Sequence, residues 1–249
     1  MKIAFSKPTR DADELRELFA SFRVAGYQGL QLKGGQYSGS LADPVRFTGT
    51  WGQDPALTSA LITMGTLDAG GVAQLRRVIA FGARTGAERV VFCHDHPRDG
   101  VTAGDLAGFA RTLSGLGQEA ADQGLALSLH HHYQQPVMHR PDFDVFFGAA
   151  SHVGLTVDTA HLAKSGITDI AGLIRDLHAV IDNIHVKDYD DRGEFRILGQ
   201  GTLDFAAILA ALREIGYEGW LCVDEESTAS LAEGLQASRD YLREQLGLP

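Results

Sequence analysis

Cysteine is scarce in this sequence, and the features that mark membrane-spanning and secreted chains are missing. Among 249 residues there are two cysteines, Cys93 and Cys222, with no Cys-x-x-Cys spacing. This argues against a disulfide framework and is typical of the reducing cytosol, so we expect a cytoplasmic protein. No run of about 18 apolar residues occurs, so we expect no membrane span. Only three apolar residues follow Lys2, which predicts a strand and not a signal peptide.

Clustered positive charge is also absent. The chain carries 22 Lys and Arg residues against 32 Asp and Glu residues, for a net charge of −10. A protein that binds nucleic acid needs a basic stripe or patch that faces the phosphates. We therefore expect no nucleic-acid partner, and the lack of a tight basic cluster slightly favours an unphosphorylated small molecule as the ligand.

Short apolar runs alternate with longer amphipathic stretches along the whole chain. Helical stretches end on glycine, the usual helix stop, as at Gly86 and Gly216. This alternation, without a long linker, predicts a single (β/α)8 TIM-barrel domain over residues 1–249. A doubly wound sheet is the alternative, but the first strand is not followed by the Gly-rich loop of that fold. The predicted strands are residues 2–6, 29–33, 60–65, 89–94, 125–130, 154–158, 183–187 and 220–224.

The last four predicted strands share one pattern of residue types. In each strand Leu, Ile or Val alternates with small or polar residues, which places the two rows on opposite faces. We expect the aliphatic row to pack against the outer helices and the polar row to point into the barrel. The polar rows end at His130, Asp158, His185 and Asp224. Barrel enzymes place their active sites at this end of the strands.

Imidazole and carboxylate groups in this arrangement indicate a metal site. Each residue has an ordinary explanation when taken alone, such as a hydrogen-bonded histidine or a helix cap at Asp158. Four residues in phase on four successive strands favour metal binding. We predict that His130, Asp158, His185 and Asp224 bind the metal, with Glu226 as the alternative to Asp224. Such a set suits Mn, Co, Zn or Fe better than Mg or Ca.

Further residues near these strand ends are candidates for catalysis. Lys187 is in phase with His185 and would act as an acid or polarise a substrate oxygen, although a salt bridge at the barrel rim is an equal explanation. Glu226 is a candidate base or acid. His161 follows Asp158 by three residues and would orient the substrate or a ligand.

Candidate substrate contacts lie close by. His132 is in phase with His130 and is expected to line the pocket, whereas His131 is out of phase and is expected behind the ligands or at the surface. Lys33, at the end of the second strand, is a weaker candidate for the role proposed for Lys187. His94 and Arg196 complete the predicted substrate contacts, with an ordinary loop position as an equal explanation for His94.

Four segments resemble the xylose isomerase-like TIM-barrel superfamily of sugar isomerases and epimerases. They are "AGYQGLQLKGG" (25–35), "GLTVDTAHLAKSG" (154–166), "DNIHVKDYDD" (182–191) and "LGQGTLDFAAILAALREIGYEGWLCVDEES" (198–227). The resemblance covers nearly the whole chain, in order, and is specific for the superfamily but not for a substrate. It implies a divalent metal, often manganese, at the four ligand positions named above, and a sugar or cyclitol substrate.

Two positions depart from the epimerases of this superfamily. Those members usually have glutamates where this chain has His130 and Asp224, and the two glutamates move a proton on either face of the substrate. The segment "LHHHYQQ" (129–135) resembles instead the corresponding segment of inosose dehydratases, which remove water from a keto-inositol. The match of "VDEES" (223–227) to those lyases is weaker, so this second resemblance is partial.

The sequence thus predicts a metal-dependent sugar isomerase or epimerase that removes the proton α to a carbonyl. Two alternatives stay open: an inosose-type dehydratase, and a metal-binding barrel without catalysis. A barrel-type AP endonuclease is disfavoured, because it would need a basic face for DNA. Assembly into a homo-oligomer is also left open.

Overall fold

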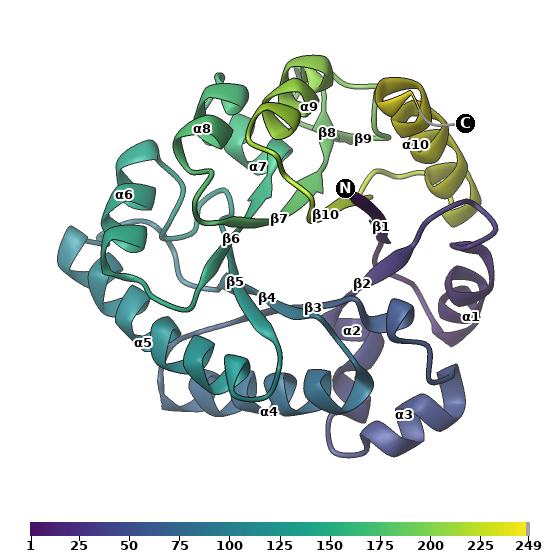
Figure 1. The fold of residues 1–249 in the computed structure, drawn as a ribbon, viewed down its shortest axis with the longest axis horizontal. Coiled ribbons are helices and arrows are strands. Elements are labelled where there is room, and N and C mark those ends of the chain that lie inside the picture. The colour runs from purple at the N-terminus through teal and green to yellow at the C-terminus, as the bar shows by residue number, and fades with distance from the viewer. Residues whose placement is uncertain (248–249) are drawn as a thin grey trace.

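Eight parallel strands close into a barrel in the computed structural model, which describes residues 1–247 (Figure 1). Their order around the barrel is β1-β10-β7-β6-β5-β4-β3-β2, so neighbours in the chain are neighbours in space. This confirms the predicted (β/α)8 fold. The strands are β1 (Lys2–Ser6), β2 (Gly29–Lys33), β3 (Ala60–Gly65), β4 (Arg89–His94), β5 (Ala126–His130), β6 (Gly154–Asp158), β7 (Ile181–Val186) and β10 (Trp220–Asp224).

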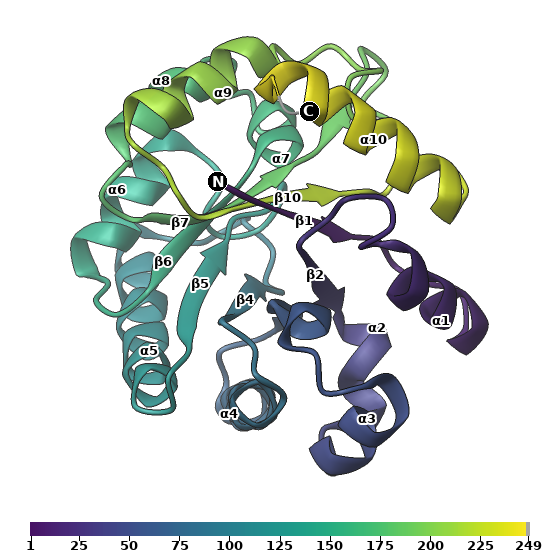
Figure 2. The ribbon, with the colours of Figure 1, turned by 45° about the vertical axis from the view of Figure 1, so that its right-hand side comes forward.

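Helices cover the outside of this barrel, as Figures 1 and 2 show. The longer ones are α1 (Ala12–Ser21), α3 (Pro44–Trp51), α4 (Ala69–Thr85), α5 (Ala103–Ala121), α6 (Arg140–Ala149), α8 (Ile170–Asp176), α9 (Phe205–Glu214) and α10 (Leu231–Leu246). Short helical segments are α2 (Gly34–Tyr37), α7 (Thr159–Lys164) and two 3-10 turns, Ser38–Ser40 and Pro55–Thr58. None of the helices in residues 1–247 is both long and apolar enough to span a membrane.

Local sequence signals set the ends of these helices. The carboxylate of Asp11 accepts the backbone N–H groups of Asp13 and Glu14 at the start of α1, and Asp68 and Thr102 cap α4 and α5 in the same way. The helix α4 ends at Gly86, whose φ of 77° lies in the left-handed region that glycine adopts without strain. The predicted glycine stop is therefore confirmed at this position.

The two faces of the strands differ as the alternation predicts. The aliphatic residues of β5, β6, β7 and β10 belong to the main core, together with side chains from the surrounding helices such as Leu113 and Phe143. The opposite face fills the barrel interior with small and polar side chains. Among these, Gln31 of β2 donates to Asn183 of β7 at 2.8 Å, and Asn183 reaches Thr156 of β6 at 3.3 Å. Apolar packing thus holds the barrel from outside, while polar contacts tie strands together inside.

The strand β7 differs from its predicted bounds. It begins at Ile181 and ends at Val186, whereas the sequence pattern predicts 183–187. The register against β6 shifts, because Leu155 pairs with Ile181 while Thr156 pairs with Asn183, which leaves Asp182 as an extra residue. Beyond β7 the chain forms a small antiparallel ribbon from β8 (Asp188–Tyr189) and β9 (Phe195–Arg196), which no sequence signal indicated.

Candidate metal centre and active-site cavity

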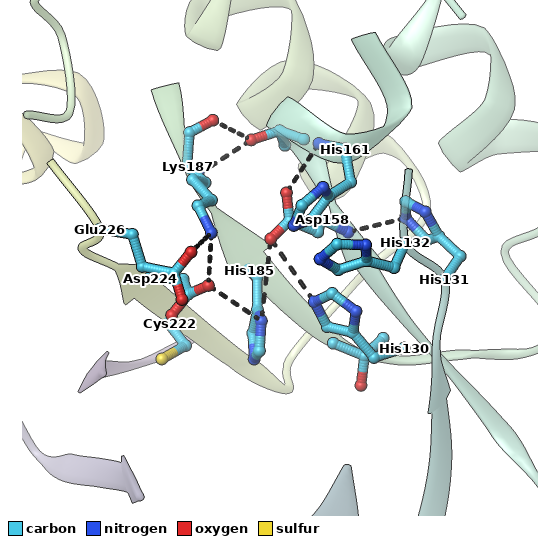
Figure 3. A network of polar contacts seen from close by, with 12 residues as sticks. His130, His131, His132, Asp158, His161, His185, Lys187, Cys222, Asp224 and Glu226 are labelled. Carbon is cyan, nitrogen blue, oxygen red and sulfur yellow. Dashed lines mark hydrogen bonds and ion pairs between the residues drawn. The ribbon is translucent and has the colours of Figure 1, made fainter. Parts of the chain in front are cut away.

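Three side chains converge where β5, β6 and β7 end (Figure 3). His130 Nε2 lies 3.5 Å from Asp158 Oδ2, and His185 Nδ1 lies 4.0 Å from the same oxygen. All three side chains are buried, and the three ligand atoms lie within 4.8 Å of one another. Asp158 Oδ2 and His185 Nδ1 have no hydrogen-bond partner among residues 1–247. Buried polar atoms nearly always have a hydrogen-bond partner. A carboxylate oxygen and an imidazole nitrogen that lack one and face each other are therefore suited to bind a divalent cation.

Hydrogen bonds from neighbouring residues orient the side chains of His185 and Asp158. Gln31 Oε1 lies 2.8 Å from His185 Nε2, which places the ring proton on Nε2 and leaves a lone pair on Nδ1. Asp158 uses its two oxygens differently. Its Oδ1 accepts the backbone N–H of His161 at 2.9 Å and so caps α7, while Oδ2 faces the histidines. The helix-cap role and a ligand role are therefore compatible in one side chain.

His131 supports the same site from behind. Its Nε2 accepts the backbone N–H of Asp158 at 2.9 Å, and its ring packs edge-on against Phe143 of α6. Burial lowers the pKa of His131 to about 3, so the ring is neutral and can accept this bond. The expected position of His131 behind the ligands agrees with this geometry, and its contact anchors the β6 end.

The charges of the three converging groups follow from burial and from one another. Burial lowers the pKa of His185 to about 3, so this imidazole is neutral. Burial would raise the pKa of Asp158, but His161, His130 and other neighbours hold it well below its usual range. Burial would also lower the pKa of His130, but the Cys93 sulfur and Asp158 raise it to about 10. Asp158 therefore keeps its negative charge between two imidazoles, which favours a cation at this position.

Beside this centre lies a cluster of two lysines and two carboxylates, which we call the lysine–carboxylate cluster (Lys33, Lys187, Asp224 and Glu226). Lys33 Nζ lies 2.6 Å from Asp224 Oδ1 and 2.8 Å from Glu226 Oε1. Lys187 Nζ lies 3.1 Å from Asp224 Oδ2 and also contacts Glu226. Burial would raise the pKa of Asp224, but Lys187 and Lys33 hold it far below its usual range. Asp224 is therefore ionised, and the carboxylates raise the pKa of both lysines, so their ammonium groups keep their protons.

Adjacent glutamates at the end of β10 have opposite orientations. Glu226 faces the lysines of the cluster, whereas Glu225 lies 3.6 Å from Lys7 and accepts the backbone N–H of Ser227. The shared face of Asp224 and Glu226, expected from their spacing, is thus present in the structure.

A cavity of about 370 Å³ opens above the candidate metal centre and the lysine–carboxylate cluster. Its size suits a small organic molecule. Phe195 of β9 packs against two of the lining residues, since its ring centroid lies 4.1 Å from Lys187 Nζ and 5.7 Å from the ring of His161. The lining residues are Lys33, Gly34, Ser38, Ile62, Thr63, Met64, Gln74, Cys93, His130, His132, His161, Lys187, Asp224 and Glu226.

The rings of two histidines on the far side of this cavity pack against each other at a tilt of 37°. The ring centroids of His132 and His161 are 3.8 Å apart, and burial lowers the pKa of both rings. Figure 3 shows them on the opposite side of His185 from Lys187 and Glu226. Neutral imidazoles on one wall therefore face charged groups on the other.

Two predicted substrate contacts lie elsewhere. His94 is on the outer face of β4, where its ring meets Phe109 of α5 at 4.4 Å, and it lines a separate void of about 10 Å³. It follows Cys93, which faces the barrel interior, so strand alternation turns it outward. Arg196 is engaged by Asp190 at 2.9 Å on the β8–β9 ribbon and is not among the cavity-lining residues. The structure gives neither residue a place at the cavity.

The sequence reasoning also missed two residues that the structure brings to the site. Gln31 supports His185 from inside the barrel, and Cys93 lines the cavity beside His130. Gln31 and Lys33 are two residues apart on β2, so the sequence indicated that both point to the same face. It could not indicate which residue of β7 Gln31 would contact.

Comparison with known proteins places this site in context. The family model described as "Xylose isomerase-like TIM barrel" matches residues 55–245. An inosose dehydratase of Clostridium botulinum (strain Alaska E43 / Type E3) is 30% identical over 162 residues, covering 56% of this chain and 54% of that protein. The chain thus spans about half the length of that relative. The "Rhizopine catabolism protein MocC" of Rhizobium meliloti is 26% identical over 277 residues, covering 94% of this chain and 84% of that protein.

Solved structures share the fold over the whole chain. An L-ribulose 3-epimerase superposes with a TM-score of 0.80 at 19% identity, covering 99% of this chain and 95% of that one. The IOLI protein, solved "with a binding zinc atom", superposes with a TM-score of 0.77 at 18% identity, covering 99% and 98%. At these identities the likeness establishes the fold alone.

Proposed function

Because this chain belongs to the xylose isomerase-like TIM-barrel family, we propose that it is a divalent-metal-dependent isomerase or epimerase of a sugar or cyclitol. It would act by removing the proton α to a carbonyl. One observation carries this proposal. The unpaired ligand atoms of Asp158 and His185 converge with His130 beneath a 370 Å³ cavity whose walls carry proton-transferring groups. Manganese is the proposed cation, with Co, Zn and Fe suited to the same donors.

The metal would be held by His130, Asp158 and His185, and it would supply positive charge that stabilises the substrate oxygen as the proton leaves. The residues of the cavity would do the rest. Burial would lower the pKa of Lys187, but Asp224, Asp158 and Glu226 raise it, so its ammonium keeps its proton and suits an acid or a hydrogen-bond donor.

Glu226 is our candidate for the base. A base near neutral pH must lack its proton, which a carboxylate does and a lysine with a raised pKa does not. The side chain of Glu226 is 30% exposed, more than any other member of the lysine–carboxylate cluster, so it is the most accessible to a substrate. On the opposite wall, the neutral rings of His132 and His161 would bind substrate hydroxyls and carry a proton on that side. Groups on two walls are what an epimerase needs.

A dehydratase is the second candidate, and a specific observation favours it. The curated relatives that match half of this chain are named inosose dehydratases, and His130 stands where the epimerases of the family usually have glutamate. The first step would be the same proton removal by Glu226. The chemistry would then diverge, because a β-hydroxyl would leave as water, with Lys187 as the acid that protonates it.

Deuterium exchange tests the shared step and separates the two outcomes. Protein purified without a His tag would be analysed for metals, then incubated in D2O with a panel of keto-sugars and keto-inositols under NMR. We expect about one first-row metal per chain and deuterium at the carbon α to the carbonyl. An epimer or positional isomer as product supports the first candidate, and a product that has lost water supports the dehydratase.

Matched variants connect the result to the site. Glu226→Gln should abolish exchange and keep the metal, while Glu119→Gln, on the exposed face of α5, should leave both unchanged. Metal without exchange on any substrate would indicate a binding protein, and no metal uptake would refute the proposal. We also propose a cytoplasmic location, because Cys93 and Cys222 are both free thiols.

A further inference from the structure

The carboxylate of Asp224 is engaged by lysines on both of its oxygens. Oδ1 lies 2.6 Å from Lys33 Nζ and Oδ2 lies 3.1 Å from Lys187 Nζ. Its Oδ2 lies 4.0 Å from His185 Nδ1, the same distance that separates Asp158 Oδ2 from that atom, so the distance to His185 does not tell the two carboxylates apart. Among residues 1–247, the groups that bring ligand atoms within 4.8 Å of one another are His130, Asp158 and His185, without Asp224.

Asp158 has the surroundings of a metal ligand, whereas Asp224 has those of a counter-ion to lysines. Asp158 Oδ2 faces two imidazoles, and no ammonium group lies within ion-pair distance of it in the described residues. Asp224 lies between two ammonium groups, and Lys187 is almost fully buried. If Asp224 turned to the cation, it would leave Lys187 with Glu226 as its remaining close anion, and buried charges that lose a partner are strongly disfavoured.

Cation and lysines therefore compete for Asp224, and the geometry favours the lysines. We propose that the metal is held by three protein side chains, His130, Asp158 and His185, and that Asp224 is a positioning residue that fixes Lys33 and Lys187 at the cavity wall. This inference rests on the metal site of the proposed function and proposes three protein ligands where the sequence pattern predicts four. Three protein ligands leave more coordination positions for substrate oxygens than four do.

Cobalt binding provides a test that does not depend on activity. Metal-free wild type, Asp158→Asn and Asp224→Asn would be titrated with Co²⁺, with visible absorption reporting the coordination and a competing chelator giving the affinity. We expect Asp224→Asn to stay within about threefold of the wild-type affinity with the same spectrum. Asp158→Asn should weaken binding by about 100-fold or more, since loss of a supporting contact alone costs 10- to 100-fold.

A charge-balanced variant guards against a folding defect. Asp224→Asn leaves two buried lysines with fewer anions, whereas Lys33→Met/Asp224→Leu removes one charge of each sign. Thermal unfolding in chelator would confirm that each variant folds. Both variants should keep the cobalt spectrum, and Asp224→Asn should lower kcat for deuterium exchange by about tenfold or more, because Lys187 loses a partner that positions it.

Three results would overturn the inference. One is a loss of cobalt affinity in Asp224→Asn that matches the loss in Asp158→Asn, and another is a changed spectrum in the charge-balanced variant. Either would make Asp224 a ligand while leaving the proposed function intact. The third is an unchanged kcat in Asp224→Asn, which would remove its positioning role. Failure of the wild type to bind cobalt would refute the proposed function together with this inference.

Discussion

Replacing Gln31 by methionine should weaken metal binding although Gln31 is not a proposed ligand. In the structure Gln31 Oε1 accepts from His185 Nε2 at 2.8 Å, and the Gln31 amide also exchanges hydrogen bonds with Asn183 at 2.8 and 3.1 Å. Methionine has nearly the same shape and none of these contacts. His185 would lose the acceptor that keeps its proton on Nε2, so its ring would be free to carry the proton on Nδ1, the proposed ligand atom.

The size of both effects follows from the contacts. Two buried groups, on His185 and Asn183, would each lack a partner at a cost of about 1–3 kcal/mol. Asn183 keeps its bond to Thr156 at 3.3 Å, so we expect a loss of unfolding free energy near the lower end, about 2–4 kcal/mol in total. Loss of a contact that orients a histidine ligand typically lowers metal affinity 10- to 100-fold, and we expect a change in that range.

Two assays separate the effects. Urea unfolding in the presence of chelator measures stability without metal, and competitive Co²⁺ titration measures affinity. Gln118→Met, on the exposed side of α5, is the matched control and should change neither. If Gln31→Met were destabilised as expected but bound cobalt with the wild-type affinity, the argument that Gln31 fixes the His185 tautomer would be wrong.

Three further outcomes are expected. Phe195→Ala should raise KM and lower kcat/KM by about 5- to 30-fold in the exchange assay, because the contact of its ring with Lys187 contributes about 1–2 kcal/mol in a partly dry site. An unchanged KM would argue against this role of the Phe195 ring. His131→Phe should lower both unfolding free energy, by about 1–3 kcal/mol, and cobalt affinity, because the N–H of Asp158 loses its acceptor; wild-type values in both titrations would exclude this support. Burial lowers the pKa of His94 from 6.5 to about 4. The unfolded chain therefore takes up a proton at this ring more readily than the folded protein, and the free energy of unfolding should fall by about 2–3 kcal/mol as the pH drops from 6.5 toward 4. Urea unfolding across this range should show a flatter pH dependence for His94→Leu than for wild type, and parallel curves would refute the assignment.

Strand positions could be read from the sequence because they depend on local pattern. The bounds of β1, β2, β3, β4, β6 and β10 match the predicted residues, and β5 begins one residue later. The strand β7 was misplaced because its start depends on pairing: the extra residue Asp182 appears only when β7 is set against β6. No run of residues near position 181 could encode that register.

The alternation of residue types along each strand also predicted most of the residues that meet at the site. His130, Asp158 and His185 converge as their phase predicts, and Lys33, Lys187 and Glu226 reach the same cavity. The same rule, applied to β4, would have turned His94 outward, since Cys93 next to it faces the interior. Arg196 was a weaker candidate, because its place on the β8–β9 ribbon depends on a turn with no clear signal.

By itself, therefore, the sequence determined which residues form strands, which face of each strand points inward, and which ligand-type groups stand at the strand ends. These properties follow from period-two alternation and from the closed order of a barrel. The tertiary structure alone decided which groups meet across the barrel. Gln31 contacts His185, which lies 154 residues further along the chain, and Asp224 is contacted by Lys33 of β2 and by Lys187, which follows β7. Such pairings depend on distances and charges between distant strands, which only the closed barrel sets, and they place Asp224 between two lysines and Asp158 beside two histidines.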